Sequence, residues 1–113
     1  MTITYKVKGY DLTTTNLTTV LTINTSSVAI IKEISVANDN NAAVECNYFF
    51  RDSSDSVDYK FYHSRPPANS HDNAVHNVLV LEAGDSLKFQ VAVANKISGQ
   101  ISYALINRSQ ENG

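Results

Sequence analysis

Short runs of alternating apolar and polar residues fill most of this chain. From Leu87 to Val93 the larger apolar side chains occupy every second position, which predicts a strand with one apolar face. Residues 78–81 form a second apolar run, and Gly84 lies in the polar turn between the two runs. Because glycine adopts positive φ at little cost, this segment predicts a β-hairpin with one buried face.

Comparable runs predict the remaining strands, at residues 3–8, 20–23, 28–36, 44–51, 57–62 and 101–106. In the third of these runs Lys32 interrupts the apolar parity, which indicates a β-bulge near this residue. Asn- and Asp-rich clusters between the runs are typical of turns. Pro66 and Pro67 cannot serve a central ladder, so residues 64–73 are expected to form a surface loop.

About eight short strands without a capped helical window predict an all-β fold. An antiparallel β-sandwich of jelly-roll-like topology is the economical arrangement for strands with one apolar face. The length of 113 residues suits a single domain, residues 1–113. Residues 1–16 are expected to be an N-terminal arm or an edge strand, and residues 109–113 a frayed tail.

Charge and composition exclude several partners. The formal net charge is −2 and the basic residues form no cluster, so the sequence predicts no nucleic-acid binding. No apolar run is long enough for a membrane helix, so no membrane partner is expected. A single cysteine, Cys46, permits no intrachain disulfide, and its parity within an apolar run predicts a core position.

Two residue sets are of types that could carry chemistry, and neither predicts an enzyme. His63, His71, Asp72 and His76 lie in and beside the long loop, but their spacing matches no ligand pattern, so neither a metal nor another cofactor is expected. Glu82 and Asp85 flank the Gly84 turn as paired carboxylates do in glycosidases. Acidic residues at a turn are usually solvated, and we expect that role here.

Parity places three aromatic side chains, Tyr10, Tyr62 and Phe49, on outward-facing positions. Such side chains could stack on a sugar or line a protein interface. For Tyr62 and Phe49 we expect coverage, either by the second sheet or by a neighbouring subunit.

Three segments carry a resemblance to a known family, and they span most of the chain from Val20 to Ile106. They are residues 34–38 (ISVAN), 81–87 (LEAGDSL) and 101–103 (ISY). Together they resemble small virion structural proteins of tailed bacteriophages, especially marine and cyanobacterial ones. Residues 24–28 (NTSSV) depart from that family, whose members often carry Pro and Gly there.

The resemblance implies a non-enzymatic virion component that docks in multiple copies on the particle. It would serve in capsid decoration or as a neck or tail accessory, with other virion proteins and itself as partners. The protein would assemble in the reducing host cytoplasm, where a chain without disulfides fits. The alternative is a carbohydrate- or receptor-binding module of a tail fibre. The expected partner contacts are Phe49, Tyr62, Arg65, Pro66, Pro67 and Asn69.

Overall fold

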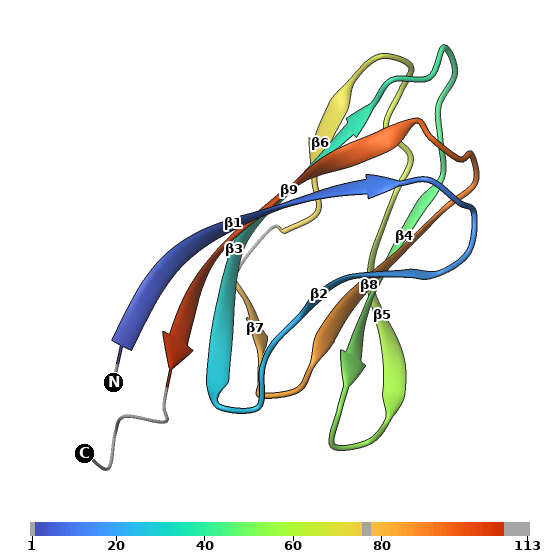
Figure 1. Cartoon of the computed structure of the whole chain (residues 1–113). Helices are drawn as coiled ribbons and strands as arrows, with labels where there is room; N and C mark the ends of the chain where they lie inside the picture. The colour runs from blue at the N-terminus through green and yellow to red at the C-terminus, as the bar shows by residue number, and fades with distance from the viewer. Residues whose placement is uncertain (1, 76–77, 108–113) are drawn as a thin grey trace.

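The structure is a computed structural model that describes residues 2–75 and 78–107. Within these ranges the chain forms nine strands and no helix (Figure 1). The strands are β1 (Thr2–Leu12), β2 (Thr18–Thr22), β3 (Ser27–Asn38), β4 (Cys46–Asp52), β5 (Val57–Ser64), β6 (His71–Asn73), β7 (Leu79–Leu81), β8 (Ser86–Val91) and β9 (Ile97–Asn107). The predicted frayed tail, residues 109–113, lies outside the described residues.

The strands form two antiparallel sheets. The first has the order β1-β9-β3-β6, with β7 also paired to β3, and the second has the order β2-β8-β4-β5. β6 and β7 pair with successive parts of β3 and therefore act as one interrupted strand. Counted this way, the strand order is that of an eight-stranded jelly roll. This confirms the predicted all-β, antiparallel, jelly-roll-like sandwich.

The core lies between the inner faces of the two sheets. Phe89 is its central side chain, because its ring meets Tyr10 of the first sheet at 5.2 Å and Tyr48 of its own sheet at 5.0 Å, both edge-on. Such edge-to-face pairs add to the stabilisation from burial. Around them pack the aliphatic residues Leu12, Ile31, Ile34, Val36, Leu81, Leu87, Ile97 and Ile101.

The predicted bulge in the third run is confirmed. The pairing of β3 with β9 shifts between Ile31 and Glu33, so Lys32 is the extra residue. Because of this insertion, Ile31 and Ile34 both face the core and are fully buried, although their sequence parity differs.

The predicted β-hairpin at Gly84 is wrong. β7 pairs with β3 in the first sheet, whereas β8 pairs with β2 and β4 in the second. The connection is therefore a corner between sheets, although Gly84 does have positive φ, at 83°. Alternation and a glycine turn describe both arrangements equally well, and only long-range contacts distinguish them.

Two outward aromatic assignments are corrected as well. Tyr10 lies inside the sandwich, because β1 continues to Leu12 instead of ending near residue 8. The Tyr10 hydroxyl donates to the Ser35 carbonyl at 2.7 Å. Tyr62 lies opposite Tyr48 and packs on its ring at 5.5 Å. The cause is a bulge in β5 at Phe61, which reverses the parity of the residues that follow it.

Candidate functional site

The outer side of the first sheet carries apolar side chains where a sandwich usually presents polar ones. Strand registers place them in two rows that cross the sheet. One row runs from Ile3 through Ile106 to Val28. The next row runs through Tyr5, Ala104, Ile30 and Val80. We call these residues, together with Val7, the outer apolar face.

Several members of the outer apolar face are widely exposed. Ile3, Tyr5, Val7 and Val80 have exposed fractions of 52%, 77%, 65% and 54%. Val28, Ile30 and Ile106 are half-buried between them. Isolated exposed apolar residues are normal, but a contiguous patch usually marks a contact surface.

The first sheet reaches beyond the second at the end that carries the N-terminus. In Figure 1 the start of β1 and the end of β9 run together toward the two termini, with β3 beside them. The side chains from Thr2 to Gly9 are exposed on both sides of β1. The molecule is correspondingly elongated, with principal extents of 53 × 27 × 23 Å. This projection makes the outer apolar face accessible to a large partner.

A polar groove of about 570 Å³ lies where three inter-strand turns meet. Its lining residues are Thr25, Ser26, Ser27, Val28, Asp52, Ser53, Ser54, Glu82, Ala83 and Asp85. Hydroxyls and carboxylates dominate this lining. It can offer hydrogen bonds to a polar ligand, but it includes no aromatic platform for stacking on a sugar.

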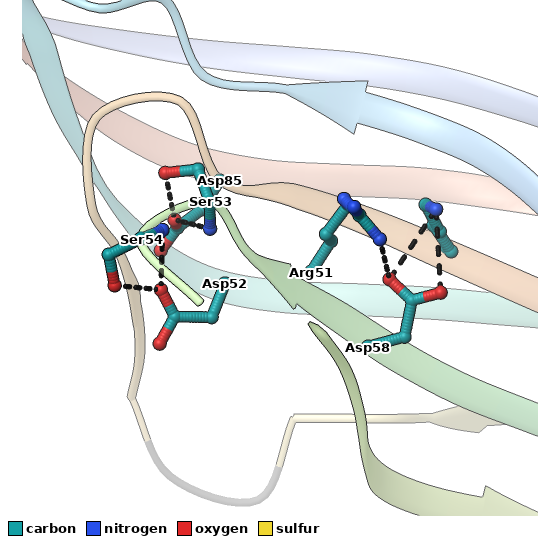
Figure 2. Close-up of polar contacts among 7 residues, drawn as sticks. Arg51, Asp52, Ser53, Ser54, Asp58 and Asp85 are labelled. Atoms are coloured by element: carbon teal, nitrogen blue, oxygen red, sulfur yellow. Dashed lines mark hydrogen bonds and ion pairs between the residues drawn. The ribbon is translucent and has the colours of Figure 1, made fainter. Parts of the chain in front are cut away.

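Asp85 is the structural centre of this groove. Its carboxylate accepts hydrogen bonds from the Ser53 N–H at 3.0 Å and the Ser53 hydroxyl at 3.0 Å (Figure 2). It also accepts one from the Glu82 N–H at 2.9 Å. The residue is only 4% exposed, so the expectation that it is solvated is wrong. Asp85 therefore ties the β4–β5 turn to the β7–β8 corner, and its oxygens are occupied by this task instead of being open to a substrate.

The neighbouring Asp52 shapes the β4–β5 turn. It accepts from the Ser54 hydroxyl at 2.6 Å and the Ser54 N–H at 3.0 Å (Figure 2). The hydrogen bond from this hydroxyl lowers the pKa of the Asp52 carboxyl below its usual range. Asp52 is therefore held as a carboxylate acceptor and is poorly suited to donate a proton as a catalytic acid.

The outer side of the second sheet is charged where that of the first is apolar. Asp58 lies 3.2 Å from Arg51, as Figure 2 shows, and 3.4 Å from Lys88. Lys88 points away from the core, as its parity predicts, while Phe89 beside it is fully buried. The two sides of the sandwich therefore differ in chemistry.

The expected contact residues lie away from the outer apolar face. Phe49 is half-buried and pairs with Lys60 and Lys88 on the charged side of the second sheet. Tyr62 is half-buried against Tyr48. Phe49 and Tyr62 therefore lie on opposite sides of the second sheet. Contact by Phe49 and Tyr62 stays a prediction.

The Pro66–Pro67 loop is built more firmly than a free surface loop. The side-chain amide of Asn38 donates to the carbonyls of Pro66 at 3.0 Å and Pro67 at 3.1 Å. Pro66 is buried, which leaves Arg65, Pro67 and Asn69 as the exposed members of the expected set. Contact by these three also stays a prediction.

The histidine set does not converge within the described residues. His63 Nδ1 lies 2.9 Å from the side-chain oxygen of Asn47, on the second sheet, whereas His71 and Asp72 belong to β6 in the first. His76 lies outside the described residues. No group of three possible metal ligands occurs among residues 2–75 and 78–107.

Cys46 is 1% exposed and burial raises the pKa of its thiol, which makes it an unreactive core residue.

The outer apolar face was not predicted, although the sequence carries a signal for it. Apolar residues occupy odd positions at Ile3, Tyr5 and Val7 and even positions at Tyr10 and Leu12. β1 pairs with β9 without any irregularity, so this change of parity moves the apolar side from the outside of the sheet to the core. A regular strand with such a change presents apolar residues on both sides.

Similarity to known proteins is confined to the fold. No protein-family model and no curated protein sequence matches this chain. A chain in the acid-stable capsid structure of Helicobacter pylori bacteriophage KHP30 is similar at a TM-score of 0.59 and 11% identity, over 96% of this chain and 90% of that one. A chain of the disulfide-linked pili of Bacillus endospore appendages is similar at 0.54 and 10%, over 95% and 88%. A family 29 carbohydrate-binding module reaches only 0.40 at 10% identity, over 93% and 92%.

Proposed function

We propose that this protein is a non-enzymatic structural component of a bacteriophage particle, which docks in multiple copies on other virion proteins. The proposed role is capsid decoration or an accessory position in the neck or tail. The outer apolar face is the single observation that carries it, and we assign docking to that surface.

The outer apolar face fits a protein partner better than it fits a small ligand. Its residues lie along four neighbouring strands and spread across one side of the sheet. Tyr5 supplies a large amphipathic ring of the kind enriched at protein interfaces. Covering apolar area of this kind is the main favourable term in most protein association.

The likeness in fold supports the proposal in a second way. The phage capsid chain and the pilus chain each match this chain over most of its length, so the shared unit is the complete jelly roll. Both belong to structures built by assembly. Since the identities are 11% and 10%, this support concerns the architecture, and the docking argument rests on the surface itself.

Incorporation into particles tests the proposal. Val80→Asp places a charge on the outer apolar face, and Val57→Asp makes the same change on β5 of the other sheet, where the residue is 41% exposed against 54% for Val80. We expect purified particles to contain many copies of the wild-type and Val57→Asp chains and at least tenfold fewer of Val80→Asp, the loss that about 1.4 kcal/mol of weaker binding produces.

Circular dichroism of both purified variants should match the wild type, which separates loss of docking from loss of folding. Absence of the wild-type chain from purified particles would refute virion membership. Equal incorporation of the two variants would refute docking through the outer apolar face.

The polar groove favours one second candidate, a carbohydrate- or receptor-binding module of a tail fibre. Its hydroxyls and carboxylates could accept and donate hydrogen bonds to sugar hydroxyls. Without an aromatic platform in its lining, this candidate has less support than docking. A glycan array distinguishes the two, since specific binding that is lost in Glu82→Ala would favour the module.

A further inference from the structure

We propose that two copies of this chain pair edge to edge through β1, in antiparallel orientation, about a two-fold axis at Tyr5. The pairing would join the two β1-β9-β3 sheets into one continuous sheet. This inference goes beyond the proposed docking function, because pairing is a property of the isolated protein and can be tested without a particle.

The first argument is that β1 provides the regular edge among the four strand edges of the sandwich. β2 is short and contains a bulge between Thr19 and Leu21, and β5 contains one at Phe61. The edge opposite β1 is divided into the two short strands β6 and β7. Bulges and short strands are two of the devices by which proteins blunt an edge against further pairing, and lysine side chains are a third.

β1 has neither a bulge nor an interruption, and its charged residues before Gly9 are Lys6 and Lys8. All its residues from Thr2 to Leu12 pair with β9 in one register, and β9 is its hydrogen-bonded neighbour within the described part of the chain. From Ile3 to Lys8 the side chains are exposed on both sides of the strand. We call residues 3–8 the open edge. It offers another strand an unbroken ladder, because β1 is the end strand of its sheet among the described residues.

Symmetry limits the registers that two open edges can adopt. A two-fold axis perpendicular to the sheet leaves the outer sides of both copies on the same side of the joined sheet. Directly opposite residues point to the same side, so the two residues of each pair across the axis must both be odd-numbered or both be even-numbered. Tyr5 therefore pairs with Tyr5 of the second copy, or with another odd-numbered position. Registers that pair an odd with an even position are excluded.

Charge selects among the registers that remain. An axis at Lys6 would bring two lysines directly opposite each other, and an axis at Val7 would oppose Lys6 and Lys8 twice. Like charges in direct cross-strand pairs are destabilising. An axis at Tyr5 places Lys6 opposite Thr4 and Ile3 opposite Val7. It is the longest register that avoids a direct lysine–lysine pair.

The same register extends the outer apolar face. The row through Tyr5, Ala104, Ile30 and Val80 would continue into the corresponding row of the second copy. Ile3 and Val7 would form apolar cross-strand pairs on both sides of the axis, the kind of pair that stabilises sheets. The pair would present one apolar surface of double width to a particle.

Oligomeric state in solution tests the pairing. Sedimentation equilibrium should show a concentration-dependent dimer for the wild type, and Tyr5→Asp should weaken association at least tenfold by placing two carboxylates at the axis. Val80→Asp is the matched control, because it adds the same charge to the same face far from the open edge and should leave the dimer intact. Tyr5 is 77% exposed, so its replacement should not disturb the folded monomer.

Cysteine crosslinking tests the register. Ile3→Cys and Val7→Cys, mixed in equal amounts with a short thiol-to-thiol crosslinker, should give a covalent dimer, whereas each variant alone should give little. Native Cys46 is buried and should not react. Crosslinking between Ile3→Cys and Tyr5→Cys instead would overturn the axis at Tyr5.

Three results would overturn edge pairing itself: a wild-type protein that stays monomeric, a dimer that survives Tyr5→Asp, or a dimer that Val80→Asp disrupts equally. The last result would indicate face-to-face packing of outer apolar faces. Particle incorporation is measured independently. A monomer that still incorporates would therefore refute the pairing and leave the docking function standing.

Discussion

At the scale of single residues, Asp85 shows how a motif that suggests chemistry can serve architecture. The segment LEAGDSL contains two carboxylates beside a glycine turn, and the structure uses them differently. Asp85 is buried and accepts three hydrogen bonds, while Glu82 is exposed. The LEAGDSL segment is therefore a device that fixes a corner between sheets.

Replacing Asp85 should destabilise the fold without any loss of a catalytic function. Asp85→Ala leaves the Ser53 and Glu82 N–H groups without their acceptor, and we expect the free energy of unfolding to fall by about 2–4 kcal/mol. Urea denaturation measures the change. Glu82→Gln is the control and should alter stability by less than about 0.5 kcal/mol. Equal effects of the two substitutions would contradict the assignment.

Two core tyrosines give the protein a predictable response to alkali. Burial raises the pKa of the Tyr10 and Tyr48 hydroxyls well above the ordinary value of 10.0. Both are neutral in the folded protein, whereas in the unfolded chain they ionise near pH 10. Their contribution to stability is thus fully present below about pH 10 and is lost as the pH rises above it.

We therefore expect the free energy of unfolding to decline steeply above about pH 10, and less steeply in Tyr48→Phe. Urea denaturation across this pH range measures the decline. Tyrosinate absorbance provides a second reading, since Tyr10 and Tyr48 should ionise only as the protein unfolds. Ionisation of all 6 tyrosines near their ordinary pKa in a protein that remains folded would contradict the prediction.

At the scale of elements, the bulge in β3 lets both halves of the strand face the core although their apolar residues differ in sequence parity. On either side of Lys32 the core-facing residues have opposite sequence parity, odd at Ile31 and even at Ile34. Removing the inserted residue would force one half of β3 to turn its buried side chains outward.

Deletion of Lys32 should therefore prevent folding, while Lys32→Ala should change stability by less than about 0.5 kcal/mol because the side chain is exposed. Expression in soluble form and circular dichroism of the two variants measure the difference. A folded deletion variant with native stability would show that the register of β3 is not fixed by this residue.

Elements were predictable to the extent that their signals are local. Alternation predicts the strands, and the interruption at Lys32 predicts the bulge, because both depend on which side of a strand is buried. The Gly84 connection and the bulge at Phe61 were not predictable in this way. Whether two consecutive strands share a sheet, and where β5 gains a residue, are decided by partners distant in sequence.

At the scale of the whole molecule, the sandwich class followed from the number and spacing of strands, but the candidate site did not. The outer apolar face joins residues from β1, β3, β7 and β9, which come together only when the sheet forms. The expected contacts around Pro66 relied on the idea of a variable loop. Asn38 instead anchors that loop by hydrogen bonds to two consecutive carbonyls.

In the proposed pairing, the contrast between one regular strand edge and three interrupted ones among the described strands would limit how many neighbours each molecule binds. A molecule with one edge available for strand pairing can bind one neighbour through it, so strand addition would stop at a pair instead of continuing into a fibre. The bulge in β2 would then prevent a further copy from pairing at that edge. A variant in which a second strand edge is made regular would bind two neighbours and would polymerise instead of stopping at a pair.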